Sequence, residues 1–197
     1  MGIDEDKRAT LRRFAAVGAA SPLAAVADRD DDSEVREAII GYLGATPGAH
    51  FSKIRDDLKL GTGEAQYHLE RLQKAGGVET RRDGDYRRFY PVGRFSDFEQ
   101  VALGYLRRDT PRGMIVELLR DPTQTGSDLA ARLDVSRATI SSYATELKGV
   151  GLLADGDGYR IERPETVLTL LVRYADSFDE RTAELATEAA SLVQYDP

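Results

Sequence analysis

An internal repeat, which relates residues 40–76 to residues 115–151, constrains the fold of this 197-residue sequence more than any other feature. When the chain is aligned with itself so that position 40 meets position 115, the two stretches match without an insertion. The matches fall on apolar and turn positions, which is typical of two copies that share a core but not a surface. The paired residues are Ile40 and Ile115, Leu43 and Leu118, Pro47 and Pro122, Ser52 and Ser127, Ile54 and Leu129, Leu58 and Leu133, Leu60 and Val135, Ala65 and Ile140, Leu72 and Leu147, and Gly76 and Gly151.

Each copy predicts three helices and then a two-stranded ribbon. The first helix is expected to open at Ser33 in copy one and at Thr110 in copy two, where Pro111 follows. The next two helices are expected at 52–58 and 62–75, and again at 127–133 and 136–149, with Ser52 and Ser127 as N-caps. The ribbons are expected at 78–82 with 86–90, and at 152–154 with 159–162.

Helix, helix-turn-helix and hairpin in this order form the winged helix-turn-helix arrangement. We therefore predict a mainly α fold with small β-hairpin wings, built from two tandem winged helix-turn-helix modules plus a C-terminal helix. The expected segments are an N-terminal extension (1–32), a first module (33–93), a connecting helix (96–107), a second module (108–163) and a C-terminal helical dimerisation segment (164–195).

The resemblance to the winged helix-turn-helix arrangement covers roughly residues 33–91 and 110–163, about three fifths of the chain, and two shorter stretches within it resemble a known family. "LGTGEAQYHLERLQKAGGV" and "LDVSRATISSYATELKGVGLL" resemble the third helix and exit of ArsR- and MarR-like archaeal regulators. The order of segments resembles the tandem winged-helix transcriptional regulators of haloarchaea. This resemblance implies a DNA-binding regulator that meets double-stranded DNA as a homodimer. ArsR-like metal sensors usually bind metal through Cys and His, and this chain departs from that pattern, so metal sensing is not implied.

The composition of the chain excludes several kinds of functional site. The chain has no cysteine, which excludes disulfides, thiolate redox sensing and Cys-zinc sites. His68 aligns with the edge of the core and is expected to be buried, and His50 is expected in a turn as a surface or packing residue. No nucleophile–base pair, phosphate-binding loop or metal-ligand spacing is visible, so we expect neither an enzyme nor a cofactor.

The formal net charge is −7, yet 22 of the 27 basic residues are Arg and 20 of the 34 acids are Asp. This Asp-rich, Lys-poor balance resembles the proteins of salt-accumulating haloarchaea, which stay soluble with an anionic surface. An isoelectric point near 5.0 therefore does not exclude DNA binding.

The third helix of copy one is the predicted recognition helix. If Leu69 and Leu72 face inward, helical spacing turns its amino-terminal half toward solvent, where it would fit the major groove. Gln66 would pair with adenine, whereas Glu64 would repel phosphate unless it accepted from cytosine. The alternative is a simply solvated face, which we favour for Glu70 and Gln73. The predicted DNA contacts are Thr62 (also the expected cap), Gly63, Glu64, Gln66, Tyr67 and Arg71.

The first wing is locally basic, with seven basic and three acidic residues between positions 71 and 94. Because alternate side chains of a strand share a face, one Arg of each pair is expected on each side of the ribbon. Such an edge suits phosphates or a narrow minor groove. The alternative is that the arginines solvate the hairpin or pair with Asp83 and Asp85. The predicted wing contacts are Arg81, Arg82, Arg87 and Arg88.

Copy two is less basic than copy one: its formal net charge is +1 over residues 132–148 and −1 in its wing. It is expected to bind DNA weakly, or to serve as a spacer or dimer platform. Its predicted contacts are Arg137, Thr139, Ser141 and Ser142.

Two further helices are expected outside the copies. Ser96 and Glu99 form a capping box for a helix at 97–107 that would pack the two modules together. After Pro164, apolar residues step alternately by four and three, as in a heptad seam. This seam predicts a homodimer helix, and the alternative is packing on its own chain. The seam residues are Leu171, Ala175, Phe178, Thr182, Leu185, Ala189 and Leu192.

The amino-terminal segment permits two interpretations. Arg12, Arg13 and an Ala-x-Ala at 25–27 resemble a twin-arginine export signal. The segment is weakly apolar and is interrupted by Pro22, and its residues 11, 14, 15 and 18 have the spacing of a helix that docks on the body. No run of 18 apolar residues occurs, so no membrane-spanning helix is expected.

The leading hypothesis is a cytoplasmic, sequence-specific DNA-binding transcription regulator without a membrane segment. The alternatives are a winged-helix module that binds proteins of the transcription machinery, or an exported or membrane-anchored winged-helix protein. The sequence specifies neither the operator, nor an effector, nor the sign of regulation.

Overall fold

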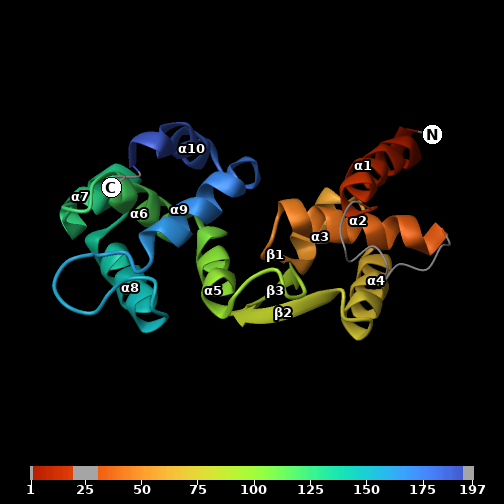
Figure 1. The fold of residues 1–197 in the computed structure, drawn as a ribbon, viewed down its shortest axis with the longest axis horizontal. Helices are drawn as coiled ribbons and strands as arrows, with labels where there is room; N and C mark the ends of the chain where they lie inside the picture. Colours follow the sequence, from red (N-terminus) through yellow and green to blue (C-terminus); the bar gives the residue numbers. More distant parts are fainter. Residues whose placement is uncertain (1, 20–30, 193–197) are drawn as a thin grey trace, which may run out of the picture. The chain divides into compact units, whose positions relative to one another are not determined.

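The computed structural model describes residues 2–19 and 31–192, which divide into unit 1 (Met1–Ser96) and unit 2 (Asp97–Pro197) (Figure 1). The described residues are mainly helical, with one small three-stranded antiparallel sheet. This confirms the predicted fold class at that level.

Unit 1 is built on four helices: α1 (Gly2–Ala19), α2 (Asp31–Ala45), α3 (Phe51–Asp57) and α4 (Thr62–Lys74). Their core residues recur at helical spacing, and Ile39, Leu43, Ile54 and Leu72 are fully buried. Burying one such side chain contributes about 1.5–3 kcal/mol, so these buried apolar residues hold α2, α3 and α4 together.

Helix α1 packs against α2 and belongs to the same core. Leu11 and Ala15 are buried, and the Phe14 ring meets Tyr42 edge-on with 5.3 Å between ring centroids. Arg12 and Arg13 are exposed on α1, whereas the Ala-x-Ala at 25–27 lies outside the described residues. No helix within residues 2–19 and 31–192 has the length and apolarity needed to cross a membrane.

The sheet of unit 1 has the order β1-β3-β2, with strands β1 (Ala49–His50), β2 (Val78–Asp83) and β3 (Tyr86–Pro91). Asp83 pairs with Tyr86 across a two-residue loop in which Gly84 has φ 58°. A glycine adopts this left-handed conformation without strain, which suits a tight hairpin. The loop comprises residues 84–85, because each strand is one residue longer at its C-terminal end than predicted, and the short strand β1 was not predicted.

The predicted N-caps of the short helices are wrong. His50 caps α3, where its Nδ1 accepts from the Lys53 amide at 3.3 Å. Thr125 caps α7 (Gly126–Leu133), and the Asp128 carboxylate accepts from the Thr125 amide at 2.9 Å. An N-cap residue immediately precedes the helix, and its side chain accepts from an amide two or three residues later. Ser52 and Ser127 already lie inside their helices.

Replacing Thr125 by Ala is expected to destabilise unit 2 by about 1 kcal/mol, because two amides at the start of α7 lose their side-chain partner or its orientation. Thermal unfolding followed by circular dichroism measures the loss. Thr169→Ala on α9 is the matched control, since that exposed hydroxyl donates only to the Glu165 carbonyl of its own helix. An equal loss in both variants would contradict a capping role for Thr125.

Unit 2 contains α5 (Asp97–Leu106), α6 (Asp109–Arg120), α7, α8 (Arg137–Gly149), α9 (Pro164–Arg173) and α10 (Glu180–Leu192). In the register of the repeat, the first residues of α7 and α8 align with the first residues of α3 and α4, and the last residue of α6 aligns with the last residue of α2. The element bounds therefore follow the register found in the sequence. Helix α5 packs against α6 and α9 of its own unit.

The second ribbon is much shorter than predicted. Leu153 and Ile161 form an isolated bridge, flanked by a hydrogen bond of 2.8 Å from the Ala154 amide to the Arg160 carbonyl. The intervening "DGDG" turns through Gly156 and Gly158, which both have positive φ. Two glycines in one loop lower the chain's preference for extended pairing, so the ribbon ends after a single bridge.

The C-terminal segment is not one continuous helix, which corrects the heptad prediction. A 3-10 turn, Ala175–Ser177, separates α9 from α10, and the Asp179 carboxylate then accepts from the Thr182 amide at 3.0 Å, so a new helix begins there. Leu171 and Leu185 are each 0% exposed within unit 2. Ala175, Phe178 and Ala189 are half-buried, and the side chain of Leu192 lies outside the described part. Most of the seam thus packs on its own chain.

Arg112 joins α6 to the start of α10. This side chain is 5% exposed, and its guanidinium lies 2.8 Å from both the Asp179 and the Asp109 carboxylates. It also donates to the Leu106 carbonyl at 2.9 Å. A buried cation requires such partners, so Arg112 and Asp179 fix the position of α10 on α6.

Candidate nucleic-acid interface

Helix α4 has one buried face and one solvent face. Ala65, His68, Leu69 and Leu72 are buried, which confirms the inward positions predicted from the helical spacing and the burial of His68. The residues on the opposite side are exposed. They are Gly63, Gln66, Tyr67, Glu70, Arg71 and Lys74.

The wing lies along one flank of α4. In the β2–β3 register Arg82 is opposite Arg87 and Arg81 is opposite Arg88, so one Arg of each pair lies on each side of the ribbon. The Arg87 guanidinium donates to the Gln73 amide oxygen of α4, and to the Thr80 hydroxyl at 3.2 Å. Arg87 therefore connects the wing to α4. Gln73, which we predicted to be simply solvated, is its acceptor.

Arg88 is buried and not exposed on the wing, which opposes its predicted contact with DNA. It is 2% exposed, its guanidinium is paired with Asp83, and it donates to the Gly48 carbonyl at 3.0 Å. The partners of Arg88 thus lie within the sheet and in the turn before β1. Arg82 is exposed and donates to the Gly84 carbonyl at 3.3 Å, and Arg81 is half-buried.

Glu64 has a structural role at the start of α4. Its carboxylate accepts from the Gly61 amide at 3.0 Å and from the Lys7 ammonium of α1 at 2.9 Å. Burial raises the pKa of Glu64, but these hydrogen bonds outweigh it and hold the pKa below its ordinary value. The carboxylate is therefore charged and occupied, which opposes the predicted pairing with cytosine. The N-cap is Gly61, so Thr62 is the first helical residue and not the cap.

Intrahelical contacts organise the exposed face. The Gln66 amide donates to Glu70 at 3.0 Å, and Arg71 donates to the Tyr67 hydroxyl at 2.9 Å. Arg71 also lies over the Tyr67 ring, 5.6 Å from its centroid. Lys74 lies two turns after Tyr67 on the same face and was missed, although the helical spacing that placed Tyr67 also places Lys74 there.

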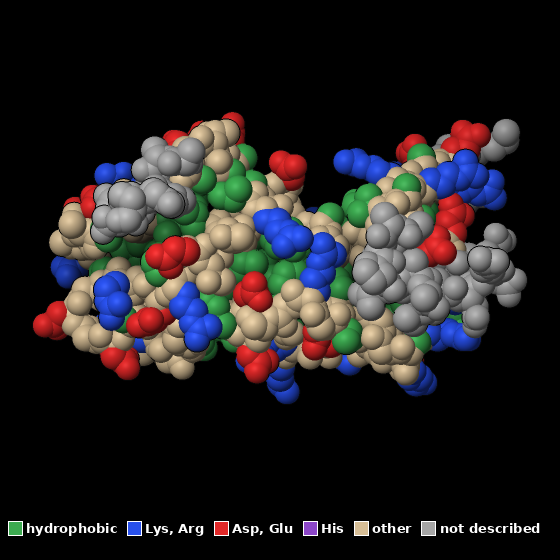
Figure 2. Space-filling view, in the orientation of Figure 1, with side chains coloured by type: hydrophobic (Ala, Val, Ile, Leu, Met, Phe, Trp, Pro, Cys, Tyr) green, Lys and Arg blue, Asp and Glu red, His purple; other side chains and the backbone are tan. Residues whose placement is uncertain are grey.

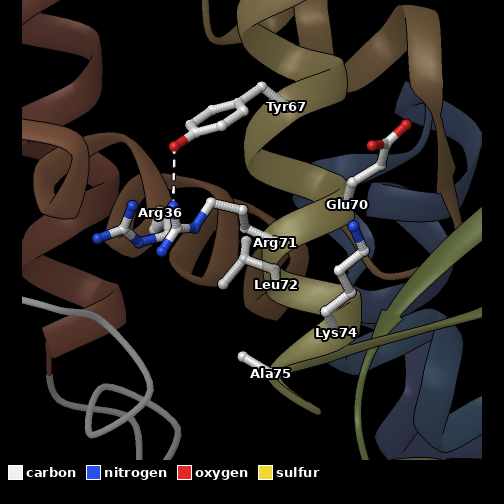
Figure 3. Close-up of a pocket in the computed structure, with 7 residues that line it drawn as sticks. All are labelled: Arg36, Tyr67, Glu70, Arg71, Leu72, Lys74 and Ala75. Carbon is white, nitrogen blue, oxygen red and sulfur yellow. Dashed lines mark hydrogen bonds between the residues drawn. The ribbon is translucent and has the colours of Figure 1, made fainter.

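A pocket of about 540 Å³ adjoins the other flank of α4 (Figure 3). Figure 3 shows the Arg71 side chain reaching toward α2, with its guanidinium directed toward that of Arg36. The lining residues are Arg36, Tyr67, Glu70, Arg71, Leu72, Lys74 and Ala75.

The corresponding helix of unit 2, α8, has a less charged surface. Arg137, Ser141 and Ser142 are exposed, and Thr139 is half-buried, with its amide bonded to the Ser136 hydroxyl at 3.0 Å. Hydroxyl groups predominate on this face, so it offers hydrogen bonds but little positive potential.

Both signs of charge occur together on the face drawn in Figure 2, where basic and acidic side chains are interspersed. Within the two described ranges, no group of three or more His, Asp or Glu side chains is arranged to hold a metal ion. Because the whole chain has a formal net charge of −7, the excess of arginine around α4 and the wing is a local property of that surface.

Three helices, a turn between α3 and α4, and a hairpin beside α4 define unit 1 as a winged helix-turn-helix domain. Residues 33–103, about a third of the chain, match a family model described as "HTH_HVO_0163_N, N-terminal HTH domain". This match confirms the predicted helix-turn-helix in unit 1.

The chain is also 24% identical over 130 residues to a protein of Methanocaldococcus jannaschii named "Uncharacterized HTH-type transcriptional regulator MJ1398". The alignment covers 66% of this chain and 32% of that relative, so the chain spans about a third of the relative's length. No solved structure matches the chain at a significant level.

Proposed function

We propose that this protein is a non-enzymatic, sequence-specific DNA-binding transcription regulator that acts in the cytoplasm. The observation that carries the proposal is the exposed face of α4 beside a wing whose Arg87 is bonded to Gln73 of that helix. A helix and a ribbon joined in this way present one continuous surface to a duplex. The name of the relative MJ1398 supports the same class of function.

In this mechanism α4 enters the major groove and the wing follows the backbone. The Gln66 amide gives up its hydrogen bond to Glu70 and binds the edge of an adenine base instead. Arg71 contacts guanine or a phosphate. The exposed Arg82 and Arg87 neutralise phosphates next to the groove, with Arg81 at the margin of the wing. The backbone amides around Thr62 and Gly63, at the positive end of the helix dipole, attract a further phosphate.

Unit 2 supplies a second, weaker helix-turn-helix in this proposal. The common register of α7 and α8 with α3 and α4 supports it. Two modules on one chain raise the effective concentration of each at the duplex, and this offsets the loss of affinity in high salt. The tandem arrangement, the haloarchaeal setting and the ArsR/MarR-like character belong to the proposal.

A homodimer also belongs to the proposal, because regulators of this architecture read paired half-sites. Leu171 and Leu185 are buried inside unit 2, so the dimer has to use a surface other than the intact seam. Light scattering of the full chain tests this point: a mass of one chain at micromolar concentration, with and without duplex, contradicts the dimer.

Selection of bound duplexes from a randomised pool tests DNA readout. The wild-type chain is expected to enrich a defined motif, and Gln66→Ala is expected to relax that motif at one base pair by about 1–3 kcal/mol of discrimination. Thr169→Ala on α9 is the control and should enrich the wild-type motif. If the wild-type chain enriches no motif, sequence-specific binding is contradicted, and the wing arginines are better assigned to an acidic protein partner.

A further inference from the structure

Helix α1 reaches the amino-terminal end of α4 on the flank that faces away from the wing. The Lys7 ammonium of α1 donates to both carboxylate oxygens of Glu64, each at 2.9 Å. Successive residues of a helix are about 100° apart, so Glu64 and Gln73 project to opposite sides of the α4 axis. Because Gln73 meets the wing, Lys7 and the wing border opposite flanks of α4.

The position of α1 does not depend on Lys7 alone. The Lys59 ammonium, in the turn before α4, lies 3.6 Å from the Asp6 carboxylate of α1. Leu11 and Ala15 of α1 are buried in the core of unit 1. Loss of the Lys7 charge should therefore leave α1 docked, so that the role of this one side chain can be tested in a folded protein.

The first turn of α4 is open to solvent. Gly61, Thr62 and Gly63 are exposed, and a β-carbon placed on Gly63 would meet no heavy atom within 4 Å. The first amides of a helix have no partner inside the helix and carry a partial positive charge. A phosphate of a duplex can thus come close to this backbone.

Glu64 is the acidic side chain of the same turn. Its side chain is 31% exposed, and its carboxylate is charged at neutral pH. A carboxylate without a counter-ion would repel a phosphate that approaches the turn. With the Lys7 ammonium against both oxygens, the pair has no net charge and this repulsion is removed.

The internal repeat offers a comparison within the chain. In its register Glu64 corresponds to Thr139, the third residue of α8. The first turn of α8 contains no acidic residue, and a neutral Ser136 hydroxyl caps it by accepting from the Thr139 amide at 3.0 Å. The copy with a carboxylate at this position is therefore the copy in which a lysine from a further helix neutralises it.

We propose that Lys7 is a positioning residue for DNA binding: by neutralising Glu64 it lets the first turn of α4 approach a phosphate of the duplex. This inference rests on the proposed function. Lys7 acts through Glu64 and not by contacting DNA, so α1 contributes to affinity as well as to the fold. Glu64 in turn keeps its capping bond to the Gly61 amide.

A double-mutant cycle, read by fluorescence anisotropy of a labelled duplex, tests this role. Lys7→Gln is expected to weaken duplex binding about tenfold, because Glu64 then faces the phosphate without its counter-ion. Glu64→Gln removes the charge and keeps an oxygen that can accept from the Gly61 amide, so it is expected to bind as tightly as the wild type. In the Glu64→Gln background, Lys7→Gln is expected to change the affinity by less than about twofold.

Arg12→Gln is the matched control on the same helix. The Arg12 guanidinium lies 3.7 Å from the Glu34 carboxylate of α2, so this variant also loses one positive charge and one ion pair of α1. It leaves Lys7 and Glu64 paired and should change the duplex affinity by less than about twofold. Equal losses in Lys7→Gln and Arg12→Gln would show an effect of net charge and would overturn the proposal.

The remaining outcomes separate the other roles of Lys7. An equal loss from Lys7→Gln with Glu or Gln at position 64 would show that Lys7 contacts DNA itself. Equal losses in Lys7→Gln and Glu64→Gln, with lowered melting temperatures, would show a merely structural ion pair. Either result overturns the proposal, as does wild-type affinity in Lys7→Gln. If the wild-type chain binds no duplex at all, the proposed function fails and this inference fails with it.

Discussion

Duplex binding by a chain with Arg82→Gln and Arg87→Gln is expected to be about 30-fold weaker than that of the wild type near physiological salt. Each substitution removes one phosphate contact worth about 1 kcal/mol, and about 1.4 kcal/mol corresponds to a factor of ten. Arg87→Gln also breaks the bond to Gln73, which releases the wing from α4. Fluorescence anisotropy of a labelled duplex measures the change.

The salt dependence of duplex affinity distinguishes direct phosphate contacts of the wing from a general effect of the protein's net charge. Loss of two phosphate contacts should reduce the slope of log affinity against log salt by about two. Arg13→Gln with Arg173→Gln is the matched control, because these exposed arginines of α1 and α9 lie outside the α4–wing surface and outside both ribbons, and the change in net charge is the same. Equal losses in both double variants would show a general field effect and remove the wing from the interface.

Asp179→Asn is expected to lower the stability of unit 2 by about 2 kcal/mol at pH 7. Removing one partner of a buried ion pair usually costs more, but the Asp179 side chain is 42% exposed and solvent replaces part of the interaction. Asn keeps the oxygen that caps α10, so the substitution removes mainly the charge facing Arg112. Denaturant unfolding measures the loss, and Asp176→Asn, an exposed carboxylate three residues earlier, is the control.

The difference between wild type and Asp179→Asn should depend on pH in one direction. Burial raises the pKa of Asp179, but hydrogen bonds from Arg112 and Thr182 outweigh it and hold the pKa at about 2, against 3.8 ordinarily. A carboxyl with a lowered folded-state pKa stabilises the fold above its unfolded pKa and loses that contribution as the pH falls toward the folded value. The two proteins should therefore converge from about pH 4 downward. A constant difference between pH 7 and pH 3 would contradict the ion pair.

Local sequence patterns were sufficient for much of unit 1. Helical spacing placed Leu69 and Leu72 in the core, and alternation along the ribbon divided each Arg pair between its two sides. Both inferences need only neighbouring residues and a known period. The register of the internal repeat likewise anticipated where α7 and α8 begin.

Features that depend on distant contacts were missed. Arg88 is buried because the Gly48 carbonyl, 40 residues away in sequence, and the Asp83 carboxylate both bind it. Nothing in a run of arginines distinguishes that residue from Arg87. Strand β1 has two residues, too few to show a period, and it forms only because β3 lies beside it.

The C-terminal break was misjudged for a different reason. A heptad stripe is equally compatible with a partner chain and with a groove in the same chain. Asp179 as a capping residue, followed by the acidic Glu180 in the first turn, is a helix-start signal within the stripe, and it was available in the sequence. The buried Leu171 and Leu185 show that the same stripe serves the interior of unit 2.

The matched helix-turn-helix begins at residue 33, yet the cooperative folding unit begins earlier. Leu11 and Ala15 of α1 share the core with Tyr42, and Lys7 binds Glu64 at the start of α4. A fragment cut at residue 33 would leave an apolar strip of α2 open to water and the Glu64 carboxylate without its lysine. The smallest fragment of this protein in which α4 keeps its native contacts therefore includes α1.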